Sequence, residues 1–248
     1  PAPAPKTGEG GTATGEGSDQ APVKTASGPL DALKPLGQFD ANVRASVGML
    51  KTQGIPVKDI AADISLVAGD LTIRKFAVAD ALSTGISVSG ELLGLDRTPT
   101  AKGLAVNAEL RDPAKLAALA GAELPVPAKS LGKIDVNTKI NGDLKQPSLS
   151  STVKAMAATL EADGDLKLLD PADTFDLGLR FRHADTASLM RRLGTDYRPS
   201  GEIGGVDLST RIKGGAEAFT FSNLAAAIGA VKLNGDGTVR LAGARPAR

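Results

Sequence analysis

This 248-residue sequence predicts a mainly β fold, an elongated antiparallel β-sheet or groove of repeated units with a few short α-helices. Three observations support this prediction. Apolar and polar residues alternate with a period of two in many short runs, as in strands with one dry and one wet face. Dipeptides that favour tight turns lie near these runs. The same order of strand, helix and strand recurs after about 73 residues.

Residues 1–29 are rich in Pro, Gly and Ala, and Val23 is their only large aliphatic residue. Such a segment cannot bury enough apolar surface to offset the entropy lost on ordering, so we predict a disordered linker. Because the chain begins at Pro1 rather than Met, we interpret it as a segment of a longer protein. No run of about 18 apolar residues is present, so a signal or membrane anchor would lie outside this segment.

Strands are predicted from residue 30 onward. In the clearest run, even-numbered positions are apolar, at Ile134, Val136 and Ile140, and odd-numbered positions are polar, at Asp135 and Asn137. This alternation places the polar groups on one face of the strand. The remaining predicted strands cover residues 86–88, 104–110, 166–168, 177–181, 206–212, 231–233 and 239–241. We expect hairpin turns at Asn141-Gly142, Asp163-Gly164, Asn234-Gly235 and Asp236-Gly237, because these residues tolerate a positive φ.

Two short helices are expected between strands. Asp112 can accept hydrogen bonds from the first free amides of a helix over residues 113–120, and Pro113 suits the first helical position. Asp185 precedes a similar helix over residues 186–193, with Arg191 and Arg192 near its negative end. These helices make the repeat visible, because Leu104 to Leu116 aligns with Leu177 to Leu189. The approximate units are 30–103, 104–176 and 177–243, followed by a tail at 244–248.

The composition argues against several functions. With 29 basic and 28 acidic side chains, the net charge of +1 gives no basic field for nucleic acid. The chain has no Cys and one histidine, His183, which we expect to be a solvated residue at a strand end. A lone imidazole cannot supply a catalytic triad or a multi-histidine metal centre. We therefore predict no enzyme activity, no catalytic or metal site and no cofactor.

The face of the predicted sheet that carries the apolar side chains is the candidate functional surface. Its predicted lipid-facing residues are Ile134, Val136, Ile140, Leu177, Leu179, Phe181, Val206, Leu208 and Ile212. An acyl chain that buries several hundred Å² on such an aliphatic wall gains several kcal/mol, at about 25 cal/mol per Å². The same alternation also fits a closed core in which these side chains pack on one another. The pattern leaves both possibilities open.

Three segments resemble a known family. Leu30 to Arg44, Leu50 to Ile60, and Gly69 to Ile73 followed by Ser87 to Leu92 are similar to the periplasmic region of AsmA-family proteins. That family is related to bridge-like lipid-transfer proteins and TamB-type envelope proteins. The resemblance extends over about Leu30 to Leu241, and its motifs are strand and turn patterns that contain no catalytic residue.

The resemblance implies an envelope protein of Gram-negative bacteria in the periplasm, anchored in the inner membrane by a segment outside this sequence. It implies support for phospholipid transport between membranes, or for outer-membrane assembly, through an apolar β-groove with phospholipid acyl chains as partners. The alternative is a structural scaffold module of the cell envelope, with a closed core and no lipid path. No protein partner is predicted, and a nucleic-acid partner is not expected.

Overall fold

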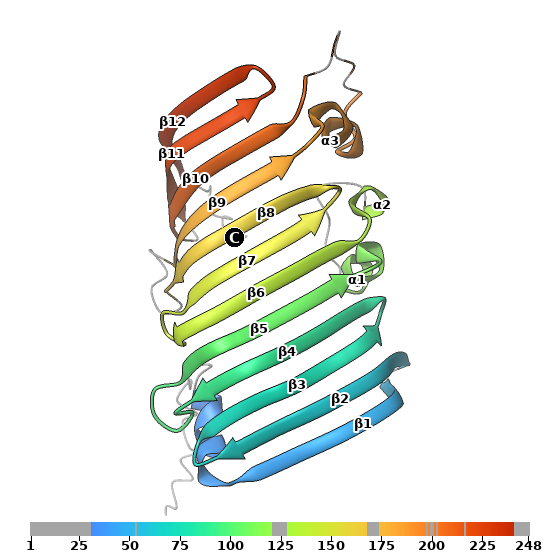
Figure 1. The fold of residues 1–248 in the computed structure, drawn as a ribbon, viewed down its shortest axis with the longest axis vertical. Coiled ribbons are helices and arrows are strands. Elements are labelled where there is room, and N and C mark those ends of the chain that lie inside the picture. The colour runs from blue at the N-terminus through green and yellow to red at the C-terminus, as the bar shows by residue number, and fades with distance from the viewer. Residues whose placement is uncertain are drawn as a thin grey trace, which may run out of the picture.

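The computed structural model describes residues 31–240, except residues 53, 121–127, 168–173, 197, 199–200, 202 and 216. Within them, twelve strands form one open antiparallel sheet whose spatial order follows chain order (Figure 1). The strands are β1 (Ala41–Thr52), β2 (Ile55–Val67), β3 (Asp70–Ala81), β4 (Thr84–Leu93), β5 (Thr100–Leu110), β6 (Ile134–Asp143), β7 (Ser148–Ala155), β8 (Ala158–Leu166), β9 (Phe175–His183), β10 (Val206–Gly214), β11 (Ala218–Ile228) and β12 (Val231–Arg240). The predicted mainly β, elongated antiparallel sheet is confirmed. The predicted disordered linker and the tail lie outside the described residues.

The helices lie at the two ends of the strands (Figure 1). The helical segments are η1 (Asp31–Gln38), α1 (Pro113–Ala120), α2 (Ala128–Leu131) and α3 (Thr186–Arg192). α1 has its predicted bounds, and α3 starts as predicted but ends one residue earlier, because Leu193 is its cap. The Asp185 carboxylate accepts a hydrogen bond from the Ser188 N–H at 3.0 Å, as its capping role requires. The sequence patterns did not predict η1 or α2.

The four predicted glycine turns are wrong, because all four dipeptides lie within strands. Asn141-Gly142 belongs to β6, Asp163-Gly164 belongs to β8, and Asn234-Gly235 and Asp236-Gly237 belong to β12. The two strands predicted on either side of Asp236-Gly237 are therefore one strand. Its last predicted residue, Leu241, lies outside the described residues, as does Leu168.

Two of the actual hairpin turns use residues that a sequence pattern would not select. Leu82 and Ser83 connect β3 to β4 with φ values of 53° and 62°, and Met156 and Ala157 connect β7 to β8 with 54° and 65°. Gly164 has another role. A Cβ there would lie 2.1 Å from the carbonyl oxygen of Asp176 on β9, so glycine permits the close approach of the neighbouring strand.

Buried apolar side chains are few and lie near the ends of the strands. Leu66 and Ala101 are buried at the end where the β4–β5 loop also buries Leu95, whereas Ala158 and Leu189 are buried at the end that carries α3. Every extensive contact between described strands joins neighbours in the chain. The described residues thus form a single-layered sheet, with no second layer over the middle of its faces.

Candidate functional site

One face of the sheet is apolar from the first strand to the last. In an antiparallel sheet, directly paired residues point to the same face, so the strand register defines continuous rows. One row crosses all twelve strands without a polar residue: Val47, Ile60, Val78, Ile86, Ala108, Val136, Val153, Leu160, Phe181, Leu208, Ala226 and Leu233. At about 4.8 Å per strand, this row is about 50 Å long. We call the surface that contains it the apolar face.

All nine residues predicted from sequence lie on the apolar face. Val136, Phe181 and Leu208 belong to the continuous row. Ile140, Leu177 and Ile212 lie on the side of this row away from α3, where Leu177 pairs directly with Ile212. Leu179 lies between these positions on β9. Ile134 and Val206 begin β6 and β10 near the helices.

The apolar face is only partly covered by its own side chains. Most of its residues are half-buried, and Val47 and Ile86 each remain 40% exposed. A closed core would bury the same residues almost completely. The described residues therefore do not build the closed core that the alternation alone also allowed.

Two pairs of polar groups on the apolar face are hydrogen-bonded within the protein, whereas the Thr84 hydroxyl at the start of β4 is buried without a hydrogen-bond partner among the described residues. The Thr138 and Ser151 hydroxyls are paired at 2.9 Å between β6 and β7. The Thr210 hydroxyl donates to the carbonyl of Ser222 at 3.1 Å. Because these hydroxyl groups have partners within the protein, they do not require water molecules as hydrogen-bond partners on this otherwise aliphatic surface.

His183 is buried, and the expectation of a solvated histidine is wrong. Its side chain lies on the apolar face at the α3 end and is 6% exposed. Its Nδ1 accepts a hydrogen bond from the Asp185 N–H at 3.0 Å, so its Nε2 donates to the Met156 carbonyl, also at 3.0 Å. The imidazole thus joins the β7–β8 turn to the start of α3, which is a structural role.

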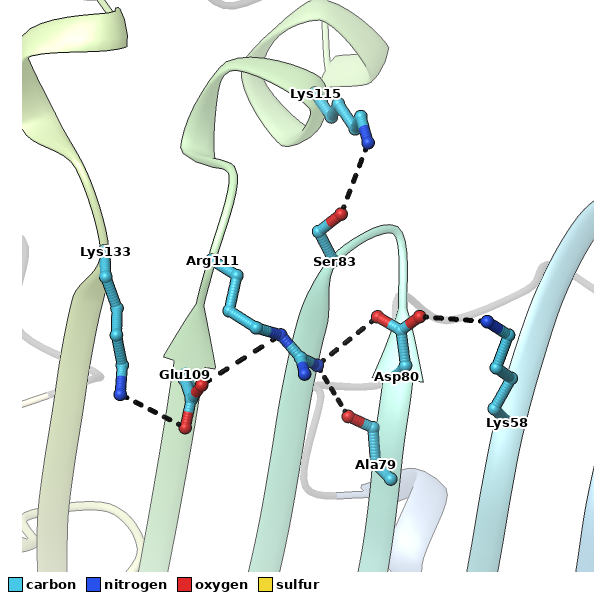
Figure 2. A network of polar contacts seen from close by, with 8 residues as sticks. All are labelled: Lys58, Ala79, Asp80, Ser83, Glu109, Arg111, Lys115 and Lys133. Atoms are coloured by element: carbon cyan, nitrogen blue, oxygen red, sulfur yellow. Dashed lines mark hydrogen bonds and ion pairs between the residues drawn. The ribbon is translucent and has the colours of Figure 1, made fainter.

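The opposite face is polar and carries ion pairs between strands. Figure 2 shows one such network, which starts from Lys58 on β2 and reaches Lys133 beside β6. Arg111 is its centre, with nitrogen–oxygen distances of 3.3 Å to Asp80 and 4.0 Å to Glu109. Lys133 lies 3.4 Å from Glu109. Hydrogen bonding to Asp135, together with the charges of Asp135 and Glu109, raises the pKa of Lys133 above its ordinary value.

A second network on the polar face is centred on Asp63 of β2. Arg44 on β1 lies 3.0 Å from one carboxylate oxygen, and Arg74 on β3 lies 2.6 Å from the other. The hydrogen bond from Arg74 makes the largest contribution to lowering the pKa of Asp63 below its ordinary value, and Arg44 adds to it. Three adjacent strands are therefore linked by charge.

The polar face also has shallow hollows, among them one of about 380 Å³ whose lining includes Ser87, Asn107 and Asn137. The apolar face is a broad surface, so the candidate site is a face and not a pocket. Among the described residues, no group of three or more His, Asp or Glu side chains could hold a metal ion. None of the helices in the described ranges is long and apolar enough to cross a membrane.

Sequence reasoning missed the parts of the apolar face on β1, β2, β3, β7 and β11. In β2, Val57 and Ile60 pair with Ala81 and Val78, and the β3–β4 register shifts between these two partners, so Val57 and Ile60 share a face although their numbers differ in parity. A strict period of two fails across such a shift. In β7, the serines of the Ser148–Ala155 segment dilute the apolar signal.

Comparisons with known proteins gave no match: no family model, no curated protein and no solved structure is similar to this chain at a significant level.

Proposed function

We propose that this chain is the periplasmic part of an AsmA-like envelope protein whose apolar face binds phospholipid acyl chains. In this role it supports phospholipid transport between membranes or outer-membrane assembly. The observation that carries the proposal is the continuous apolar row across twelve strands, which no described element covers. The resemblance of residues 30–44, 50–60, 69–73 and 87–92 to AsmA-family proteins supports it independently.

The physical chemistry of the face suits a lipid path. Each methylene group that an acyl chain buries contributes about 0.8 kcal/mol, so a chain lying along the row is held by many weak contacts. The continuous row contains no charge and no polar group that would fix a bound lipid at one position. Contacts of this kind favour sliding over tight, specific binding. Lipid headgroups would remain in water at the margins of the face.

A scaffold module of the cell envelope is the second candidate, and the sheet edges favour it. Among the described strands, β1 and β12 each pair with one neighbour, and the outer edge of each has backbone groups that can recruit another strand. This function requires partner contacts through the edges and does not require lipid on the apolar face. Lipid capture on that face therefore separates the two candidates.

A photoreactive amino acid introduced at Ile140 provides the direct test. In the native envelope of a Gram-negative cell, we expect ultraviolet light to produce a covalent phospholipid adduct, identified by mass spectrometry. The matched control is the same substitution at Lys139, the next residue of β6, which points to the polar face. Ile212 and Arg211 provide a second such pair on β10. If neither apolar position captures lipid, the scaffold function replaces the lipid function.

A charge on the apolar face should interrupt the path without unfolding the sheet. Val136 is half-buried and uncovered, so the carboxylate in Val136→Asp can remain partly hydrated. We expect a folded variant, judged by circular dichroism, that loses lipid capture at Ile140. Asn137→Asp adds the same charge on the polar face and should leave capture unchanged. Unfolding of Val136→Asp alone would show that the face is a closed interior in solution.

A further inference from the structure

The two free edges of the described sheet are unusually apolar. Eleven large apolar side chains are exposed among the described residues, and seven of them lie on the edge strands: Val43, Val47, Met49 and Leu50 on β1, and Val231, Leu233 and Val239 on β12. Edge strands of soluble proteins are usually short or protected by charges and proline. β1 and β12 have 12 and 10 residues. Long, aliphatic edges of this kind are suited to strand pairing.

The internal repeat shows what these edges can pair with. The turns between β3 and β4, between β7 and β8, and between β11 and β12 begin with a residue in the left-handed region, with φ values of 53°, 54° and 56° at Leu82, Met156 and Gly229. The strand pairs that flank the three turns have the same register: Ala81 pairs with Thr84, Ala155 with Ala158, and Ile228 with Val231. Because β5 aligns with β9 in the sequence repeat, the strands that precede them, β4 and β8, occupy equivalent places, and the shared turn geometry extends this correspondence to β12.

The same correspondence relates β1 to β5 and β9. Each of these is the first strand of its repeat, and Leu50, Leu110 and His183 have equivalent partners on the second strand in Val57, Ile134 and Val206. Within the molecule, β4 pairs with β5 and β8 pairs with β9. The free edge of β12 thus corresponds to the edges of β4 and β8 that pair with β5 and β9. The free edge of β1 corresponds to the edges of β5 and β9 that pair with β4 and β8.

Glycines mark the same correspondence. Gly90 on β4 and Gly164 on β8 have little space, because a Cβ at either one would lie 2.6 Å or 2.1 Å from a carbonyl oxygen of the following strand. β12 has Gly237 at the equivalent position, beside its free edge. A Cβ at Gly237 would also meet the Phe221 ring on β11 at 2.5 Å. Glycine at this position keeps β12 compatible with a close neighbouring strand.

We propose that copies of this chain associate head to tail, with β12 of one copy pairing antiparallel with β1 of the next. By equivalence with β4–β5 and β8–β9, Val231 lies opposite Leu50 and Leu233 lies opposite Val47. Both pairs lie on the apolar face, so the row from Val47 to Leu233 continues from one copy into the next. The contact is heterologous, and it leaves one free edge at each end, which permits longer assemblies. The proposal does not depend on lipid binding.

Sedimentation velocity of the purified full chain, measured over a range of concentrations, tests the association. We expect dimers and longer species that grow with concentration, and Val47→Lys or Leu233→Lys alone should reduce each population to monomer. A mixture of the two variants should restore a dimer and nothing larger, because each variant retains the edge that the other lacks. Symmetric pairing would instead leave one of the single variants dimeric. That result, or a wild-type chain that stays monomeric at hundreds of micromolar, would overturn the proposal.

Ile86→Lys is the matched control, because Ile86 is as exposed as Val47 but lies on the internal strand β4. It should associate like the wild type while it disturbs the apolar face, so failure of the association and failure of lipid binding can be distinguished. The register is tested by disulfide trapping in this cysteine-free chain. Leu50→Cys mixed with Val231→Cys should form a covalent dimer on mild oxidation. Leu50→Cys mixed with Val239→Cys should not, and equal trapping of both pairs would refute the register.

Discussion

The two faces of this sheet are stabilised by different interactions. On the polar face, exposed ion pairs such as those of Asp63 and Arg111 connect neighbouring strands, and exposed pairs contribute little to stability individually. On the apolar face, half-buried aliphatic side chains contact their neighbours, with no layer packed over them. The described sheet therefore has no shared core. Its stability is local, from each strand to the next, and it should respond most to changes that alter strand spacing or break buried hydrogen bonds.

The largest effect is expected from Gly164→Ala, which tests strand spacing. The new Cβ would lie 2.1 Å from the Asp176 carbonyl oxygen, and φ at Gly164 is 151°. We expect a loss of about 3 kcal/mol or more in the free energy of unfolding, measured by urea denaturation. Gly178→Ala on the polar face is the control, because its Cβ would lie 3.6 Å from the nearest atom and should cost about 1 kcal/mol or less. Equal losses in the two variants would contradict the spacing argument.

A smaller loss is expected from His183→Ala, which removes two buried hydrogen bonds at the α3 end of the apolar face. The Met156 carbonyl and the Asp185 N–H lose their partner, which should cost about 2 kcal/mol in thermal or urea unfolding. The neighbouring residue provides the comparison, because Arg182 points to the polar face and pairs with Glu161. Arg182→Ala should cost less than about 1 kcal/mol.

The same variant tests the absence of imidazole chemistry. At a temperature at which His183→Ala is folded, lipid capture at Ile140 and the cellular role of the protein should be retained. A folded His183→Ala protein without its cellular role would reopen the question of an enzyme function.

Much of the fold could be predicted because the alternation of side chains is a local property. β6 and β10 start at their predicted residues, and the caps at Asp112 and Asp185 gave correct starts for α1 and α3. The nine candidate residues lie on one face of the sheet for the same reason. Local patterns were sufficient where apolar residues alternate without a bulge and without intervening serines.

Other features depend on relations between strands, which a sequence pattern does not contain. Gly164 looks like a turn residue in sequence, but it is required by the backbone of β9. Met156 and Ala157 form a turn that their intrinsic preferences disfavour, and His183 holds that turn from another hairpin. The openness of the apolar face also could not be predicted, because an uncovered sheet and a closed sandwich have the same alternation.

A third prediction concerns the polar pair on the apolar face. Thr138→Val leaves the Ser151 hydroxyl without its partner, and we expect a loss of about 1 kcal/mol. The double variant Thr138→Val with Ser151→Ala should recover most of that loss, because neither polar group then remains. A double-mutant cycle in urea measures the coupling. Losses that simply add would show that water, and not the partner, satisfies each hydroxyl.

The smallest effect is expected at Asp63, where the polar face should respond to acid and salt. Because Arg74 and Arg44 hold its pKa below the model-compound value of 3.8, the folded state favours the ionised carboxylate. Its contribution is fully present above that value and is lost as the pH falls through the lowered pKa. The stability difference between wild type and Asp63→Asn should therefore be constant near neutral pH and shrink at acidic pH. About 1 M NaCl should shrink it as well, because screening at that ionic strength acts within about 3 Å. A difference that grows in acid would mean that Asp63 is stabilised in its protonated form, and the charge link between β1, β2 and β3 would then have to be abandoned.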